Sequence, residues 1–250
     1  MQSEEKELLL KKVDHMISVL NKSGRAQYFG FISEEDIDYI ANYLTKRKIN
    51  FDTFGGIEDS ERSYLSIYDD FPPDRTDYPV SVIKIELAKN AKEQSHRNYL
   101  GSLLGLGIDR RVIGDILIND KIAYVSVNYD FVNFIKSELT KISNESCEVS
   151  EIEDFSELKR KREFKEITIS VASKRLDAIV SELTNLSRDD SKNLITKGLV
   201  FVNGEEVLSP VKEIKPDSKI SVRKHGKFIF VAEQGNTKSG RLRLTFKKYM

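Results

Sequence analysis

The sequence has a single cysteine and no hydrophobic run long enough to cross a membrane. Cys147 has no second cysteine with which to form a disulfide bond, which is typical of a protein in a reducing cytoplasm. A membrane-spanning helix needs about 20 consecutive apolar residues. The N-terminal stretch MQSEEKELLLKKVDHM is amphipathic and lacks the pattern of a signal peptide. These absences predict a cytoplasmic protein that does not interact with a membrane.

Side chains for metal binding and nucleophilic catalysis are also scarce. The three histidines, His15, His96 and His225, lie far apart in the sequence and far from the cysteine. They give no metal-ligand spacing, and no Ser-His-Asp or Cys-His set is apparent. We therefore expect a protein without a metal, a cofactor or a catalytic residue.

The formal net charge is zero, because 40 Lys and Arg balance 40 Asp and Glu, but the charges are unevenly distributed. Residues 1–165 hold 24 basic and 30 acidic residues (24 − 30 = −6). Residues 166–250 hold 16 basic and 10 acidic residues (16 − 10 = +6). An excess of positive charge in one third of a neutral chain predicts an anionic partner for that third. A solvated basic surface without a partner is the alternative.

Residues 1–77 are expected to form an N-terminal α/β domain. Apolar residues at helical spacing predict a helix over residues 4–20. A second helix is expected in FISEEDIDYIANYL, with Ser33 as its N-cap. The segment INFDTFGGIEDSERSYLSIYDD indicates two strands around Gly55-Gly56, and two prolines that follow it mark the domain boundary.

Residues 78–158 show strand and helix patterns in turn. The expected elements are a strand at 78–88, a largely helical stretch at 96–116, a hairpin around Asn119-Asp120, a helix at 128–142 and a strand at 145–155. That order, β-α-β-β-α-β, is the ferredoxin-like split βαβ motif. The charged run that follows, ELKRKREFKEITI, is expected to be a solvated linker.

Residues 166–250 predict two short helices on a small sheet. Leu176, Ile179, Val180 and Leu183 fall on one face of the first helix, which Ser173 can cap. The second helix is expected to begin after Ser187 and to end at Gly198. A strand then leads into an Asn203-Gly204 hairpin turn, and KISVRK and KFIFV indicate further strands. The whole chain is therefore expected to be of the α+β class.

Apolar and polar residues alternate near the C-terminus. Arg241, Arg243 and Thr245 alternate with Leu242, Leu244 and Phe246, which predicts a strand with one basic and one apolar face. The apolar face is expected to dock on the protein.

Phe228 and Phe230 share one strand face, where they either cover the small core or stack on unpaired bases.

Basic residues lie on both helices and at their ends. Lys174 and Arg175 open the first helix, Arg188 and Lys192 lie one turn apart on the second, and Lys197 closes it. Such a face can contact several phosphates. Each cation also has a structural alternative, such as an ion pair with a carboxylate or a position at a negative helix end. Arg188 and Lys192 are expected to face solvent, so that their replacement leaves the fold intact.

The segment RLDAIVSELTNLSRDDSKNLITKGLVFVNGEEVLSPVKEIKPDSKISV resembles the S4 RNA-binding domain over about residues 173–225. In that family the paired helices and the adjoining loop bind RNA. The resemblance implies this role for Arg175, Ser187, Arg188, Lys197 and Asn203. With the further basic residues of the domain, the predicted RNA-binding set is Lys174, Arg175, Ser187, Arg188, Lys192, Lys197, Asn203, Arg223, Lys224, Arg241 and Arg243.

The segment HRNYLGSLLGLGIDRRVIGDILI, followed by this domain and by GNTKSGRLRLTF, resembles the YlmH-type bacterial RNA-binding proteins over nearly the whole chain. The resemblance implies an N-terminal domain (1–77), a ferredoxin-like RNA-binding domain (78–158) and an S4 domain (166–250). It also implies non-enzymatic binding to ribosomal RNA of the large ribosomal subunit, in quality control of stalled complexes that hold peptidyl-tRNA. A candidate second RNA patch consists of His96, Arg97, Arg110 and Arg111.

Two other functions stay open. Pseudouridine synthases combine an S4 domain with a catalytic Asp in a similar RLD context, but here Asp177 lies inside the S4 helix and is expected to be a helix-surface or capping acid. A deep polar pocket with converging carboxylates in residues 1–158 would favour such an enzyme. A large exposed apolar patch on the N-terminal domain would instead favour an adaptor protein, for example in cell division.

Overall fold

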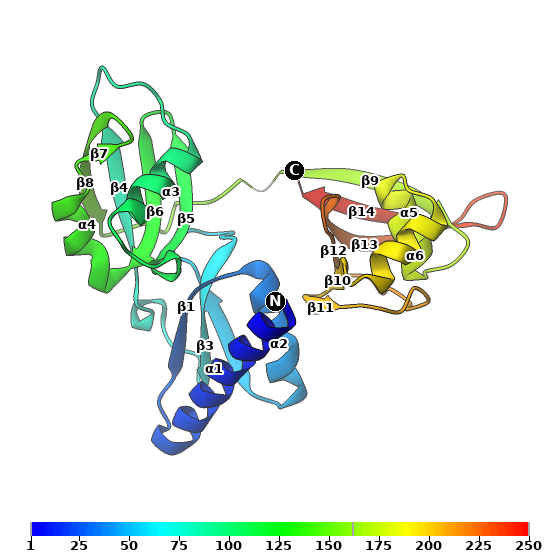
Figure 1. Cartoon of the computed structure of the whole chain (residues 1–250). Coiled ribbons are helices and arrows are strands. Elements are labelled where there is room, and N and C mark those ends of the chain that lie inside the picture. Colours follow the sequence, from blue (N-terminus) through cyan, green and yellow to red (C-terminus); the bar gives the residue numbers. More distant parts are fainter. Residues whose placement is uncertain (1, 162, 250) are drawn as a thin grey trace. The chain divides into compact units, whose positions relative to one another are not determined.

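The computed structural model describes residues 2–161 and 163–249, with residues 2–5 as backbone only (Figure 1). The chain divides into two compact units, Met1–Lys161 and Arg162–Met250, which we call the N-terminal and the C-terminal unit. Both combine helices with antiparallel sheets, which confirms the predicted α+β class. No described helix is long and apolar enough to cross a membrane.

The first part of the N-terminal unit is a three-stranded antiparallel sheet, in the order β1-β3-β2, with two helices packed against it. Its elements are α1 (Gln2–Ser23), β1 (Gln27–Ser33), α2 (Glu34–Lys46), β2 (Asn50–Phe54) and β3 (Arg62–Tyr68). The Ser33 hydroxyl accepts a hydrogen bond from the amide of Asp36, as the N-cap prediction requires. Strand β1 was not predicted. A bulge between Phe29 and Ile32 interrupts its register and so hides the two-residue alternation of a strand.

The second part of the unit is a five-stranded antiparallel sheet, in the order β5-β6-β4-β8-β7. Its elements are β4 (Val80–Leu87), α3 (His96–Gly105), β5 (Ile113–Asn119), β6 (Ile122–Asn128), α4 (Val132–Glu138), β7 (Lys141–Ile142) and β8 (Glu145–Ile152). Apart from the two-residue β7, they follow the predicted β-α-β-β-α-β order. Helix α3 ends earlier than predicted, because Gly107 adopts a positive φ of 82° and a 3-10 turn, Arg110–Val112, leads directly into β5.

Asp115, on β5, connects the two sheets and the segment that ends the unit. Its buried carboxylate accepts hydrogen bonds from the amides of Glu61 and Arg62, at 2.9 and 3.0 Å. It also pairs with the Arg160 guanidinium at 2.9 Å. Residues 158–160 form backbone hydrogen bonds with Glu58. The prediction that this charged run is a solvated linker is therefore wrong for its first residues, which pack against the N-terminal unit.

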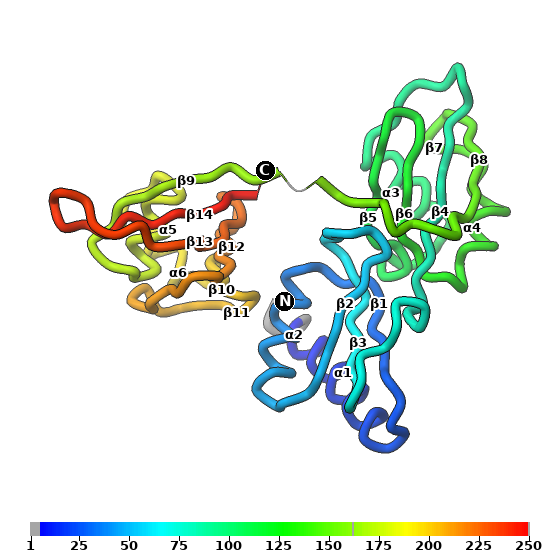
Figure 2. Tube along the Cα trace, turned by 180° about the vertical axis from the view of Figure 1, so that it is seen from behind, coloured from blue at the N-terminus to red at the C-terminus, as the bar shows by residue number. Residues whose placement is uncertain are grey.

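The C-terminal unit has a six-stranded antiparallel sheet, in the order β11-β10-β12-β13-β14-β9, and two helices that lie on one side of it (Figures 1 and 2). Its elements are β9 (Phe164–Val171), α5 (Leu176–Thr184), α6 (Arg188–Thr196), β10 (Val200–Val202), β11 (Glu205–Glu206), β12 (Lys219–Val222), β13 (Gly226–Asn236) and β14 (Leu242–Tyr249). Strand β9 pairs with β14 along its whole length. The linker prediction is wrong here too, because the charged residues around residue 160 conceal the start of a strand.

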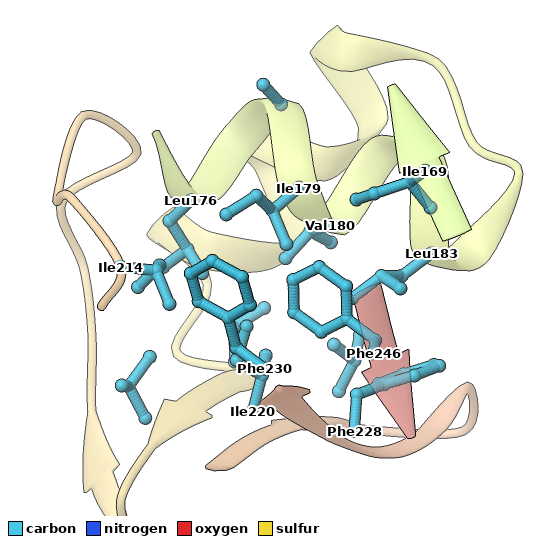
Figure 3. Packing of buried hydrophobic residues seen from close by; sticks show 14 of the residues in the cluster. Ile169, Leu176, Ile179, Val180, Leu183, Ile214, Ile220, Phe228, Phe230 and Phe246 are labelled. Atoms are coloured by element: carbon cyan, nitrogen blue, oxygen red, sulfur yellow. The ribbon is translucent and has the colours of Figure 1, made fainter. Parts of the chain in front are cut away.

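The core of the C-terminal unit lies between the two helices and the sheet (Figure 3). Leu244 and Phe246 of β14 are fully buried, which confirms that the apolar face of this strand docks on the protein. The rings of Phe230 and Phe246 are stacked, with centroids 4.9 Å apart. Phe228 is fully buried as well, so neither Phe228 nor Phe230 can stack on a base, and the core alternative is correct. Thr245, expected on the basic face, is also buried.

Candidate nucleic-acid interface

Helices α5 and α6 present the basic residues of the C-terminal unit. Leu176, Ile179 and Leu183 anchor α5 on the sheet, and Asn185, with a left-handed φ of 56°, ends it. Arg175 is the N-cap of α5, so the prediction that Ser173 caps this helix is wrong. Helix α6 begins after Ser187 as predicted. Each helix packs its buried residues against the rest of the unit, and its other side faces solvent.

A buried carboxylate joins the two helices. The Asp177 side chain, in the first turn of α5, is fully buried. It accepts two hydrogen bonds from the Arg175 guanidinium, at 3.0 and 3.1 Å. It also accepts one from the Arg188 guanidinium, on the first residue of α6, at 3.2 Å. The expectation that Asp177 is a surface acid is wrong, but its carboxylate does accept a hydrogen bond from the Ala178 amide in the first turn of α5, at 2.9 Å, as expected of a capping acid. Asp177 fixes the position of two arginines from different helices.

The two arginines keep Asp177 ionised. Burial raises the pKa of Asp177, but hydrogen bonds and attraction from Arg175 and Arg188 outweigh burial and hold this pKa below its ordinary value. The arginine side chains remain 39% and 49% exposed. Two guanidinium groups beside one carboxylate leave an excess positive charge. Because their exposed N–H groups are held in place, they are suited to bind phosphate oxygens.

Three other cations of the predicted set each form an ion pair of their own. Lys174 pairs with Glu233 of β13 at 3.1 Å, and Lys192 pairs with Asp189 at 3.0 Å. Arg241 pairs with Glu182 of α5 at 2.9 Å and donates a hydrogen bond to the Ser170 carbonyl. Lys174 is thereby held to β13, whereas the carboxylate partners of Lys192 and Arg241 lie on α6 and α5.

Lys197 and Arg243 are less constrained. Lys197 is the exposed C-cap of α6, where its positive charge complements the negative end of the helix. Arg243 is exposed on β14 opposite Ser170 of β9. In the described part of the chain, neither side chain has an ion-pair partner. Both are therefore free to contact an anion.

Two predicted RNA-binding residues have structural tasks. The Ser187 hydroxyl accepts a hydrogen bond from the Asp190 amide at 3.0 Å and donates one to the Asp190 carboxylate at 2.6 Å. The Asn203 side-chain oxygen accepts a hydrogen bond from the Lys219 amide at 2.8 Å. Asn203 and Gly204 have φ values of 50° and 74°, as the predicted hairpin turn requires. Ser187 and Asn203 therefore fix the local backbone by accepting hydrogen bonds from amides, and in this way they help to hold α6 and the hairpin turn in place.

Arg223 and Lys224 lie at the turn between β12 and β13. The Arg223 guanidinium is 6.0 Å from the centroid of the Phe201 ring, and Lys224 is exposed with a φ of 65°. Among the described residues, no hydrogen bond or ion pair connects either side chain to α5 or α6. The structure thus brings Arg175 and Arg188 together on Asp177 and pairs Arg241 with Glu182 of α5. Arg223 lies near the end of α6, because its backbone amide donates a hydrogen bond to the Leu199 carbonyl at 3.0 Å.

The candidate second patch is not gathered in one place. His96 and Arg97 are exposed in the first turn of α3, whereas Arg110 and Arg111 follow the other end of that helix. The Arg110 guanidinium donates to the Ile113 carbonyl, and burial, with repulsion from Arg62, lowers its pKa to about 10.

Arg111 forms two hydrogen bonds of 2.9 Å with Asp109. It lines a cavity of about 400 Å³ together with Lys6, Lys12 and Arg62. Its basic neighbours in this cavity are therefore residues of α1 and β3, a grouping that no local pattern in the sequence predicts.

The chain is similar to known proteins in its sequence and in its fold. Residues 73–156 match the family described as "Putative RNA-binding domain in YlmH". Over 196 residues the chain is 28% identical to the ribosome-associated protein quality control protein P2 of Bacillus subtilis (strain 168). The aligned region covers 78% of this chain and 76% of that protein. A solved structure, the cell division protein YlmH from Streptococcus pneumoniae, superposes with a TM-score of 0.55 at 21% identity, over 62% of this chain and 94% of that one. None of these proteins is named as an enzyme.

Proposed function

Because the chain belongs to the YlmH family, we propose that it is a non-enzymatic, cytoplasmic protein that binds ribosomal RNA on the large ribosomal subunit. In this proposal residues 166–250 act as an S4 domain and residues 78–158 as a ferredoxin-like domain. The protein assists ribosome-associated quality control of stalled complexes, in which tRNA is a further candidate partner. The family description and the name of the Bacillus subtilis relative support the RNA-binding, ribosome-associated part of this role.

The pair of arginines on Asp177 is the observation that carries the proposal. Half or more of the hydrogen bonds that proteins form with nucleic acids go to phosphate and sugar, and arginine is well suited to them. Arg175 and Arg188 are exposed and held by a shared buried carboxylate, so that little side-chain entropy is lost on binding. Residues 162–250 hold 18 basic and 11 acidic residues (18 − 11 = +7), which adds long-range attraction.

The catalytic alternative has no support at Asp177. A catalytic carboxylate must touch the reacting nucleotide, whereas Asp177 is fully buried and occupied by two guanidinium groups. The arrangement is suited to holding cations and unsuited to proton transfer.

Binding to isolated ribosomal subunits tests the proposed function. We expect the intact protein to co-sediment with purified large subunits, and to do so much less with small subunits. Binding to the large subunit should weaken steeply with salt, with a log–log slope of about −0.7 to −0.9 for each phosphate contacted. Equal binding to both subunits would argue against the proposed site, and a salt-independent interaction would argue against phosphate contacts.

A further inference from the structure

A cavity of about 710 Å³ opens in the N-terminal unit, next to the turn that follows β2 and to the segment that follows β8. Gly55 and Gly56 form part of its lining. A Cβ atom on Gly55 would lie 2.5 Å from the Ser60 side chain, and Gly56 has a φ of +80°. Both positions therefore require glycine, which holds the turn in one conformation.

Carboxylates dominate the charged groups of this cavity. One guanidinium, that of Arg75, and four carboxylates line it (1 − 4 = −3): Glu58, Asp59, Glu153 and Asp154. All four acidic residues are exposed. Exposed carboxylates are ionised at neutral pH, so these groups are suited to recognising a positive charge.

Two of the four carboxylates are available to a ligand. Lys159 pairs with Glu58 at 2.5 Å and with Asp59 at 3.4 Å, which partly neutralises them. Asp154 accepts hydrogen bonds from the amide and hydroxyl of Ser156, at 3.0 and 2.7 Å, and these lower its pKa. Asp154 is therefore an oriented anion, and the neighbouring carboxylate of Glu153 has no ion-pair partner among the described residues.

Aromatic rings complete the lining. The Phe54 and Phe155 rings have centroids 6.4 Å apart, with an angle of 32° between their planes. The Arg75 guanidinium already lies 5.1 Å from the Phe54 centroid and pairs with Asp52 at 3.1 Å. This contact within the chain combines a guanidinium, a ring face and a carboxylate, a combination that binds cations well. Phe155, Glu153 and Asp154 line the same cavity, so one further ring and two further carboxylates face an incoming group there.

We propose that this cavity is a docking site for an arginine side chain from a basic segment of a partner protein. The guanidinium lies against Phe155 and pairs with Glu153 and Asp154. Arginine fits better than lysine, because its planar group stacks on a ring and forms two parallel hydrogen bonds with a carboxylate. The charged side chains that line the cavity sum to −3, so the cavity itself repels a phosphate group and attracts a basic side chain.

A peptide that alternates glycine and arginine, labelled with fluorescein and titrated with the full-length protein, tests the proposal. A peptide with citrulline in place of arginine has nearly the same shape but no charge, and we expect it to bind at least about tenfold more weakly. The double variant Glu153→Gln/Asp154→Asn should lose about tenfold in affinity for the arginine peptide, a change of about 1.4 kcal/mol. Phe155→Leu should lose about threefold. Glu93→Gln, at an exposed acid outside the cavity, is the matched control and should bind like the parent.

Equal affinity for the arginine and citrulline peptides would overturn the proposal. So would a double variant that binds the arginine peptide as the parent does, or a fluorescein-labelled 12-nucleotide oligouridine whose binding to the protein the double variant weakens. The site is independent of the RNA-binding face. The neutral variant Arg175→Gln/Asp177→Asn/Arg188→Gln, in the other unit, should bind the peptide unchanged, so failure of either proposal leaves the other standing.

Discussion

Truncation after Gln234 is expected to unfold the C-terminal unit. The deletion removes β14, which lies between β13 and β9 and pairs with both. It also removes Leu244 and Phe246, which are fully buried in the core. Truncating one such side chain to alanine typically costs about 2–5 kcal/mol, and whole domains are stable by only about 5–15 kcal/mol. The loss of both, together with two hydrogen-bonded strand pairings, exceeds what the unit can tolerate.

Hydrogen–deuterium exchange followed by mass spectrometry measures this effect in each unit separately. In the truncated chain, amides of α5 and β12 should exchange as fast as in an unfolded peptide, while those of β4 and β6 in the N-terminal unit keep their protection. Lys247→Ala, on the exposed side of the same strand, should leave both units protected. Retained protection of α5 after truncation would show that β14 is dispensable.

Replacement of both arginines on Asp177 is expected to destabilise the C-terminal unit by about 3–5 kcal/mol at pH 7. Arg175→Ala/Arg188→Ala leaves the fully buried carboxylate without a positive partner. Exposure of an arginine therefore does not make its replacement harmless, contrary to the expectation from sequence for Arg188. Urea denaturation measures the loss. Lys192→Ala is the matched control, because its partner Asp189 is largely exposed, and it should cost less than about 0.5 kcal/mol.

The pH dependence of this loss identifies Asp177 as its cause. In the parent, the two arginines hold the Asp177 pKa below its ordinary value of about 3.9. The stability that they contribute is therefore present above about pH 4 and is lost as the pH falls through the folded pKa. In the double variant burial remains and raises this pKa, so the deficit relative to the parent should shrink as the pH falls. A deficit that is the same at pH 4 and pH 7 would contradict a buried, ionised Asp177.

Local signals in the sequence predicted several elements correctly. Ser187 begins α6 because its hydroxyl can bind the Asp190 amide three residues on, and Asn203-Gly204 forms a hairpin because both residues accept a positive φ. The alternation of Leu244 and Phe246 with polar residues predicted the docked strand. Each of these signals lies within a few neighbouring residues.

Features that depend on distant partners could not be predicted. Strand β9 is apolar on the face that meets the core, but its pairing with β14 joins residues about 75 positions apart, and a charged run precedes it. In the sequence, Asp177 cannot be distinguished from any other acidic residue in the first turn of a helix. Its role depends on Arg188, which the fold brings beside it from the next helix. Arg111 shares a cavity with Lys12 and Arg62 only because α1, β1, β3 and the turn before β5 pack together. Pairings at such separations leave no periodic pattern in the chain.

The salt dependence of RNA binding, compared between the parent and the variant Arg175→Gln/Asp177→Asn/Arg188→Gln, tests the central claim most directly. Glutamine and asparagine can keep hydrogen bonds at this site while all three charges disappear, so that no buried charge is left unpaired. If the two arginines each contact a phosphate, the log–log slope should become less steep by about 1.4–1.8 and the affinity should fall at every salt concentration. A folded variant with the parent's slope would contradict the assignment of this face to RNA.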